Sequence, residues 1–362
     1  MRTRTVATIA VAAVLVALIP TASSAQTPHR AGTNSYRVAK LVADELGEAR
    51  FQDPNLVNAW GLAAGPMTPW WVADADANVS TIYSHAGVAA PLVVGVDGGP
   101  TGLVFNGGDG FVVSDGMDHG PSVFLFATES GTIRGWNPEV PPPAFSDETF
   151  VVVDRSSDGA NFKGLAIAST YAGDRLYATD FHNATVDVFD EGFDPVVRPG
   201  AFTDPDIPDG FAPFGIQNVH GMLLVTYAQQ DADAEDEVAG PGLGYVDAYS
   251  LRGRLLGRVA SAGPLNAPWG LALAPEDFGR FGGDLLVGNF GNGRIHAFAR
   301  EGSGFVHEGI LRRPSGRAVV IDGLWALQFA NGGPSGPTNA LFFTAGPDDE
   351  EHGLFGRIKA SS

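Results

Sequence analysis

The sequence predicts an all-β fold, a six-bladed β-propeller, and three observations lead to that prediction. A short apolar strand pattern with a small residue inside it recurs along the chain, and its clearest copies are Asn58–Ala64 and Asn266–Ala274. Further strand patterns follow each copy. The copies recur about every 53 residues, and units of about four strands at such a period are typical of a propeller.

The repeated first strand places a small residue directly before an apolar pair. The small residues are Gly61, Gly102, Gly164, Gly215, Gly270 and Ala326. A small residue inside a strand allows a neighbouring backbone to approach closely. A tryptophan precedes the small residue in three copies, at Trp60, Trp269 and Trp325. We expect these side chains to pack between blades rather than to bind a ligand.

The later strands of each unit follow in a regular order. A second, apolar strand is expected at residues 70–73, 123–127, 175–179, 222–227, 284–288 and 340–344. A third strand, which alternates with period two, is expected at residues 79–83, 132–136, 185–189, 244–249, 294–298 and 353–358. A fourth strand is expected at residues 92–94, 150–153, 255–259 and 305–310. The unit that begins at Gly102 also holds an extra apolar run, Phe111–Val113.

A strand pattern at Tyr36–Ala43 precedes the first unit and belongs to no unit of its own. The sixth unit lacks a fourth strand, so we expect this N-terminal strand to complete the last blade and close the ring. Closure removes exposed sheet edges, which are prone to aggregation. The domain is then one propeller at residues 36–359, preceded by a disordered segment at residues 26–35.

The N-terminus has the order of segments found in a secretory signal peptide. Arg2 and Arg4 precede an apolar run from Val6 to Ile19, and small residues follow at Ser23–Ala25. The apolar run is shorter than the about 20 residues of a membrane span. We therefore expect residues 1–25 to be cleaved and the mature protein to be secreted, with no membrane span. The chain contains no cysteine, so packing alone must stabilise it.

The formal net charge of −19 excludes some classes of partner. A field of that sign repels nucleic acid and anionic lipid, and it favours solubility and cation binding. We expect a monomer that binds a small molecule, a glycan or an extracellular protein. The sequence implies no organic cofactor.

Four segments resemble a known family. They are Asp53–Gly61, Tyr177–Asn183, Ala228–Glu237 and Thr344–Glu350. These segments are similar to those of exported, functionally uncharacterised bacterial proteins of the six-bladed NHL-repeat and TolB-like propeller class. The resemblance extends from about Tyr36 to Ile358, and it implies this fold and export but no activity. Some members end in a sorting signal that is not found here, which implies a freely secreted protein.

Acidic and amide residues concentrate in loops that should share one face of the propeller, around the central opening. Carboxylate and amide oxygens are the ligands that Ca²⁺ prefers, so a site for Ca²⁺ or another divalent cation is predicted on this face. With His182 or His352 the site would instead suit Zn²⁺ or Mn²⁺. The candidate ligands are Asp74, Asp76, Asn78, Asn161, Asp180, Asn183, Asp231, Asp233, Asn266, Asn289, Asp348 and Asp349. The alternative is that these residues only form turns, in which Asp and Asn are common.

Common catalytic motifs are not found in the sequence. It has no cysteine nucleophile, no Gly-x-Ser-x-Gly elbow and no His-Glu-x-x-His motif. The catalytic candidates are Asp180 and His182, because a histidine beside a carboxylate can act as a general base. We favour a secreted ligand- or protein-binding module with a cation site. A metal-dependent hydrolase or lactonase and a purely structural extracellular protein stay open as alternatives.

Overall fold

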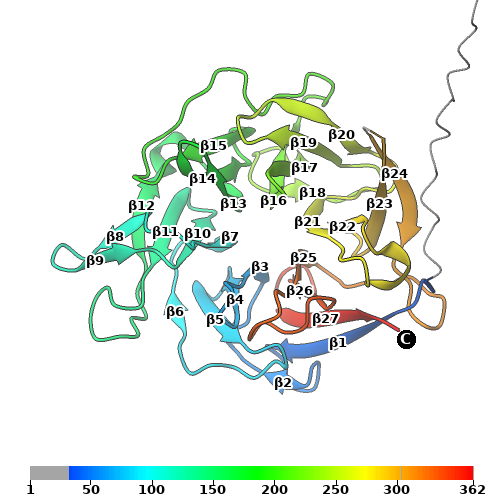
Figure 1. Ribbon diagram of the computed structural model, residues 1–362, viewed down its shortest axis with the longest axis horizontal. Coiled ribbons are helices and arrows are strands. Elements are labelled where there is room, and N and C mark those ends of the chain that lie inside the picture. Colours follow the sequence, from blue (N-terminus) through cyan, green and yellow to red (C-terminus); the bar gives the residue numbers. More distant parts are fainter. Residues whose placement is uncertain (1–31, 303, 362) are drawn as a thin grey trace, which may run out of the picture. The chain divides into compact units, whose positions relative to one another are not determined.

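The computed structural model describes residues 32–302 and 304–361, so the expected signal peptide (residues 1–25) lies outside the described residues. Within them, six largely antiparallel sheets are arranged as the blades of a β-propeller around a common centre (Figure 1). The only helices there are two 3₁₀ turns, Ser156–Asp158 and Gly279–Phe281. The predicted all-β, six-bladed fold is confirmed.

The first three blades contain strands β3 to β15. Blade 1 is β3 (Ala59–Ala63), β4 (Trp70–Asp74), β5 (Val79–Tyr83) and β6 (Val94–Gly95). Blade 2 is β7 (Pro100–Phe105), β10 (Phe124–Thr128), β11 (Thr132–Trp136) and β12 (Phe150–Asp154), with an inserted hairpin of β8 (Val112–Ser114) and β9 (His119–Pro121). Blade 3 is β13 (Phe162–Thr170), β14 (Gly173–Asp180) and β15 (Thr185–Phe189).

The remaining strands form blades 4 to 6. Blade 4 is β16 (Phe211–Val219), β17 (Met222–Gln230), β19 (Tyr245–Ser250) and β20 (Leu255–Ser261), with β18 (Glu237–Val238) paired to the end of β17. Blade 5 is β21 (Pro268–Leu273), β22 (Leu285–Asn289), β23 (Ile295–Glu301) and β24 (Gly304–Ile310). Blade 6 is β25 (Leu324–Phe329), β26 (Leu341–Ala345), β27 (Leu354–Ala360), β1 (Tyr36–Ala43) and β2 (Phe51–Gln52).

The ring closes through the N-terminal strand, as the count of strands predicted. β1 pairs antiparallel with β27, from Tyr36 opposite Ala360 to Ala43 opposite Leu354, and the two strands lie side by side in Figure 1. The segment expected to be disordered (residues 26–35) includes described residues 32–35. There, Asn34 Nδ2 donates to Ile310 O at 2.9 Å, whereas residues 26–31 lie outside the described residues.

Blade 3 has three strands, in agreement with the lack of a fourth strand pattern in that part of the sequence. Pro195 and Pro199 follow β15 closely. Proline has no backbone N–H to donate to a neighbouring strand, so this segment is poorly suited to continue the sheet.

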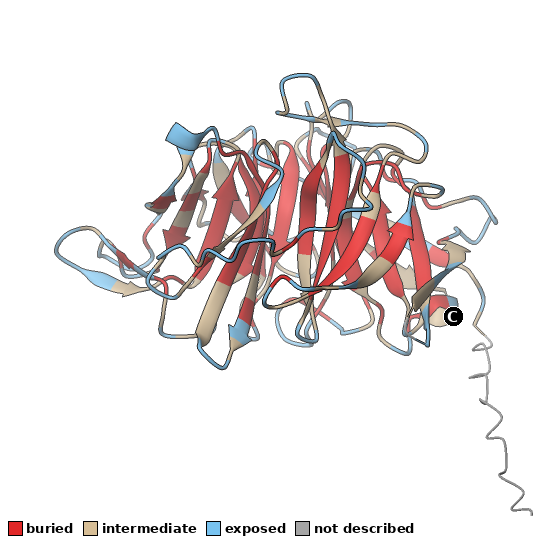
Figure 2. Ribbon diagram, turned by 90° about the horizontal axis from the view of Figure 1, so that it is seen from above, coloured by how far each residue is buried: buried red, intermediate tan, exposed pale blue. Residues whose placement is uncertain are grey.

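The small residues of the first strands allow neighbouring blades to touch backbone to backbone. A Cβ atom added at Gly61 would lie 2.2 Å from the carbonyl oxygen of Thr101, and one added at Gly215 would lie 2.3 Å from that of Trp269. The same close approach occurs at Gly102, Gly164 and Gly270. The predicted role of the repeated small residue is therefore confirmed. Figure 2 shows the consequence, with buried strands at the centre and exposed loops on both faces.

The residues that precede these small residues meet across the ring. The rings of Trp60 and Trp325 stack with centroids 3.7 Å apart. Phe214 and Trp269, from blades 4 and 5, lie 5.8 and 6.0 Å from the same Trp325 ring. The tryptophans thus pack against other blades, as expected, and they fill the centre of the ring. Among the described residues, no helix has the length and apolarity needed to cross a membrane.

We expect Gly215→Ala to lower the free energy of unfolding by about 1–3 kcal/mol or more, because the new methyl group overlaps the backbone of the next blade. Gly95→Ala is the matched control, because a Cβ there would lie 3.6 Å from its nearest neighbour, Asp147 O. The control should change stability by less than about 1 kcal/mol. Urea denaturation of both variants measures the difference, and equal effects would contradict the contact.

Candidate functional site

Three of the predicted metal ligands are buried turn residues. Asp74, Asp180 and Asn289 are the last residues of β4, β14 and β22, and each is fully buried. Asp74 Oδ2 accepts hydrogen bonds from the backbone N and Oγ1 of Thr81, at 2.9 and 2.8 Å. Burial raises the pKa of Asp74 well above its usual value. These side chains hold the turn between the second and third strands, which was the alternative reading of the acidic loops.

Other predicted ligands also hold turns or lie dispersed at the surface. Asn78 Oδ1 accepts from Gly98 N at 2.9 Å, and Asp231 Oδ1 accepts from Glu235 N at 2.9 Å. The remaining members of this exposed set are Asp76, Asn183, Asp233, Asp348 and Asp349. No group of three or more His, Cys, Asp or Glu in the described parts of the chain is placed to hold a metal ion. The metal site therefore stays a prediction.

Three asparagines before the inner strands hold loops of neighbouring blades. Asn58, Asn161 and Asn266 are buried and directly precede or adjoin β3, β13 and β21. Asn58 Nδ2 donates to Glu350 Oε2 at 2.7 Å, and Asn161 Nδ2 donates to Glu235 Oε2 at 3.1 Å. Asn266 Oδ1 accepts from the backbone N of Gly240 at 2.7 Å. The three asparagines, which hold comparable positions in their repeats, thus share one role: each anchors a loop of a neighbouring blade by a hydrogen bond.

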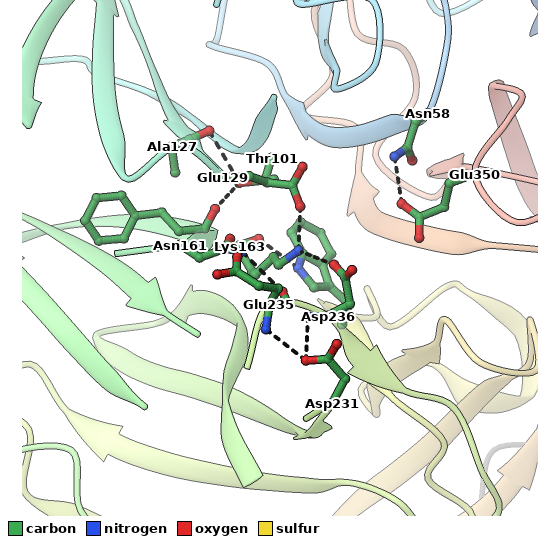
Figure 3. A network of polar contacts seen from close by, with 12 residues as sticks. Asn58, Thr101, Ala127, Glu129, Asn161, Lys163, Asp231, Glu235, Asp236 and Glu350 are labelled. Atoms are coloured by element: carbon green, nitrogen blue, oxygen red, sulfur yellow. Dashed lines mark hydrogen bonds and ion pairs between the residues drawn. The ribbon is translucent and has the colours of Figure 1, made fainter. Parts of the chain in front are cut away.

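A lysine that the sequence analysis did not select lies at the centre of this polar network. Lys163, in β13, is 1% exposed. Its Nζ atom lies 2.5 Å from Glu129 Oε1 of blade 2 and 3.2 Å from Asp236 Oδ1 of blade 4. It also lies 5.2 Å from the centroid of the Trp60 ring. Figure 3 shows both carboxylates turned towards the ammonium group. We call Lys163, Glu129, Asp236, Glu237 and Glu350 the Lys163 cluster.

Two carboxyl groups of the cluster have strongly raised pKa values. Burial raises the pKa of Glu237 to about 8, and the positive charge of Lys163 lowers it only in part. Burial likewise raises the pKa of Glu350 to about 7, against the hydrogen bond from Asn58 and the charge of Lys163. Burial would lower the pKa of Lys163, but the charges of Glu129 and Glu237 outweigh it and raise that pKa. The lysine is therefore an ammonium ion, and the carboxyl groups of Glu237 and Glu350 lose their protons near neutral pH.

Two buried polar atoms beside the cluster have no hydrogen-bond partner among the described residues. They are Asn161 Oδ1, an acceptor, and Trp60 Nε1, a donor. Asn161 is 4% exposed and Trp60 is 1% exposed. Buried polar atoms are normally paired, so the cluster offers hydrogen-bonding capacity that the protein itself does not use.

The two catalytic candidates from the sequence play different parts. Asp180 Oδ1 accepts from the backbone N atoms of Asn161 and Asn183, both at 3.2 Å, and it positions the loop. His182 is partly exposed, and its Nδ1 atom lies 3.5 Å from Glu235 Oε1. Through Glu235 and Asn161, His182 adjoins the Lys163 cluster, whereas Asp180 stays buried below it.

His352, the other histidine considered for a metal, belongs to the ring closure. Its Nδ1 atom lies 2.8 Å from Asp44 Oδ2, just after β1. The hydrogen bond that His352 donates to Asp44 raises the pKa of His352. This pair joins the loop of blade 6 to the N-terminal strand.

A signal for Lys163 is present in the sequence. Lys163 occupies the position before the repeated small residue, where other copies have Trp60, Phe214, Trp269 and Trp325. The copy at Gly102 has Thr101 there. A lysine at a position that four of the six copies fill with a large aromatic residue points inward with them and must meet compensating charge. Comparison of the copies at this one position would have selected it.

No protein-family model matches the sequence. Uncharacterized protein R648 of Acanthamoeba polyphaga mimivirus is 32% identical over 346 residues, which cover 91% of this chain and 82% of that protein. Uncharacterized protein L690 of the same virus is 30% identical over 349 residues, which cover 91% of this chain and 87% of that protein. The chain belongs to the family of these two proteins. Both of these relatives are viral proteins, so they do not support membership of the expected family of exported bacterial proteins, which stays a prediction.

Solved structures of other propellers resemble this chain in fold. A glucose dehydrogenase aligns with a TM-score of 0.54 at 14% identity, over 90% of this chain and 99% of that chain. The soluble aldose sugar dehydrogenase of Escherichia coli aligns with a TM-score of 0.51 at 12% identity, over 90% of this chain and 100% of that chain. At such identities the likeness supports the six-bladed propeller fold and nothing finer.

We expect Glu350→Gln to stabilise the protein at pH 8.5 by about 1–2 kcal/mol and to have little effect at pH 4.5. The folded-state pKa of Glu350 lies above its usual value, at about 7. The stability that its protonated form contributes is therefore present at low pH and is lost as the pH rises through 7. Glutamine mimics the protonated form at every pH.

Glu351→Gln is the control, because Glu351 is the exposed neighbour. Urea denaturation at the two pH values measures the difference between each variant and the parent chain. A loss of stability in Glu350→Gln at pH 8.5 would show that the ionised carboxylate is favourable there.

Proposed function

We propose that this protein is a ligand-binding propeller that captures a small cationic ligand at the Lys163 cluster. The observation that carries the proposal is the charge imbalance around Lys163. One buried ammonium contacts two carboxylates, Glu129 and Asp236, and two further carboxyl groups that its charge reaches, Glu237 and Glu350, keep raised pKa values in spite of it. A second positive charge in the cluster would favour the ionised form of both groups, so protonation and ligand binding compete.

The neighbouring atoms suit a ligand that has positive charge and hydrogen-bonding groups. Carboxylate oxygens accept from an ammonium group or coordinate a divalent cation such as Ca²⁺. The unpartnered Asn161 Oδ1 adds an acceptor, and Trp60 Nε1 adds a donor. No three acidic or histidine ligands stand ready for a metal in the described residues, so a metal ion would have to draw the glutamates together.

Export is part of the same proposal. The charged, apolar and small segments at residues 2–25 support action outside the cell. The net charge of −19 supports partners that are cationic or neutral.

We expect a cation that binds the cluster to raise the Tm, and to raise it more at pH 8.5 than at pH 6. Binding to the native state at a hundred times Kd stabilises it by about 2.7 kcal/mol, and the ionised glutamates prevail only above their pKa values of about 7 and 8. Thermal unfolding would be measured with CaCl₂, MnCl₂ and ZnCl₂, and separately with primary amines such as spermidine, at constant ionic strength.

The double variant Glu237→Gln, Glu350→Gln should abolish the Tm shift, whereas the exposed Asp349→Asn should keep it. A shift with the metal salts alone identifies a metal site, and a shift with the amines alone identifies an organic ligand. No shift with any of these compounds at either pH would overturn the proposal.

A hydrolase is the second candidate, and the pKa of Glu350 favours it. A general acid–base residue is most effective when its pKa lies near the working pH, and that of Glu350 is about 7. The Lys163 ammonium would stabilise negative charge that develops on a substrate oxygen beside it. His182, next to Glu235, supplies a further proton acceptor at the edge of the same cluster.

For a hydrolase we expect turnover of some member of a panel of lactones and esters, with a rate that rises through an apparent pKa of about 7. Glu350→Gln should lower kcat/KM by a factor of about 100 or more, and Glu351→Gln should leave it unchanged. Product formation would be followed by pH-stat titration. A panel with no turnover above background, or an active Glu350→Gln, would exclude this candidate.

A further inference from the structure

The outer edge of blade 3 is only partly paired, because Phe189 and Val188 at the end of β15 pair with Pro195 and Val196. β15 is the last strand of its sheet, and its neighbour on one side is β14. On the other side the backbone oxygen of Val188 accepts from Val196 N at 2.7 Å, so the backbone groups of Val188 point away from β14. Alternate residues of an antiparallel strand point the same way. The N–H and C=O of Val186 therefore also point outward, and the turn after β15 does not reach them.

A groove of about 660 Å³ runs along this edge. β15 forms its floor. The hairpin at residues 169–175, the segment at residues 195–203, and Leu251 and Arg252 also line it. Two large apolar side chains at the groove are strongly exposed, Tyr171 at 88% and Val197 at 82%. A groove that combines a free strand edge with exposed apolar side chains suits an extended peptide.

The groove is basic, although the chain carries a net charge of −19. Its lining contains four arginines and one acidic residue, Asp187. Asp187 is already paired with Arg155, at 2.7 Å. The other three arginines are Arg175, Arg198 and Arg252.

None of these three arginines has a carboxylate partner among the described residues. Arg175 donates to the backbone oxygens of Asp174 and Ala172, at 2.6 and 2.9 Å. Arg252 donates to the hydroxyl of Tyr171 at 2.5 Å. The guanidinium groups thus have N–H donors and positive charge available to an anionic partner. They line the same groove as β15.

We propose that this groove binds an extended acidic peptide segment of another protein, which pairs with β15 as the fourth strand of blade 3. The peptide backbone would exchange hydrogen bonds with Val186, as in other cases of strand addition. Alternate side chains of a strand point to opposite faces. Acidic side chains on one face of the peptide would therefore meet Arg175, Arg198 and Arg252, and apolar side chains would contact Tyr171 or Val197. The site is separate from the Lys163 cluster and does not depend on the function proposed for it.

The charge requirement is tested with a fluorescein-labelled nonapeptide of alternating glutamate and valine, by fluorescence anisotropy against the full chain. We expect saturable binding that weakens as salt is added, and no binding of the lysine–valine counterpart. The double variant Arg198→Glu, Arg252→Glu should lower the affinity by about tenfold or more. Arg300→Glu, at an exposed arginine of β23, is the matched control and should stay within about twofold.

The strand pairing is tested separately. Hydrogen exchange of the Val186 amide should slow by about tenfold or more when the peptide is bound, and a peptide N-methylated at alternate residues should not bind. Equal binding of the N-methylated peptide, or its displacement by free glutamate at matched ionic strength, would overturn strand addition. Concentration-dependent dimers that the peptide dissociates would also overturn the proposal, because the occupant would then be a second copy of this chain.

Discussion

The close backbone contact between neighbouring inner strands is the constraint on which the rest of this propeller depends. Where a Cβ atom at Gly61 or Gly215 would collide with the next blade, glycine lets the two backbones touch. Five such glycine contacts around the ring bring the preceding residues together at its centre. Trp60, Trp325 and Lys163 meet there for this reason, and not because they are close in sequence. The packing of the ring thus also creates its polar centre.

The fold was predictable because its signals are local and repeated. Period-two patterns mark the strands, and the strand count alone assigned Tyr36–Ala43 to the last blade. The site was much less predictable, because it depends on which loops converge. Asp74 and Asp180 are residues of the type that binds metals, yet Asp74 Oδ2 and both Asp180 oxygens accept hydrogen bonds from nearby donors. Lys163 is of a residue type that usually lies at the surface, and its burial depends on carboxylates from two other blades.

The structure separates its charges in an uncommon way for so acidic a chain. Its carboxyl groups gather around one lysine on the loop face, where burial keeps two of them partly protonated. Three arginines that have no carboxylate partner among the described residues lie instead along the outer edge of blade 3, where the fourth strand is missing. Each location is complementary in charge to a ligand of opposite sign. Because the two lie at opposite ends of the blade's strand order, ligands at both could bind at once without competing for the same residues.

Ring closure by β1 and β27 also has a consequence for how the chain is made. These strands pair in the finished structure, yet a ribosome that adds about 5–20 residues per second completes β27 roughly 15–60 s after β1. Throughout that interval β1 lacks its main partner, β27, and can pair only with the two-residue strand β2. Its apolar residues, such as Leu41 and Val42, are then open to chaperones and to other nascent chains. The pairing that covers the outer edge of β27 in the finished blade therefore makes the first strand the last to be fixed in place.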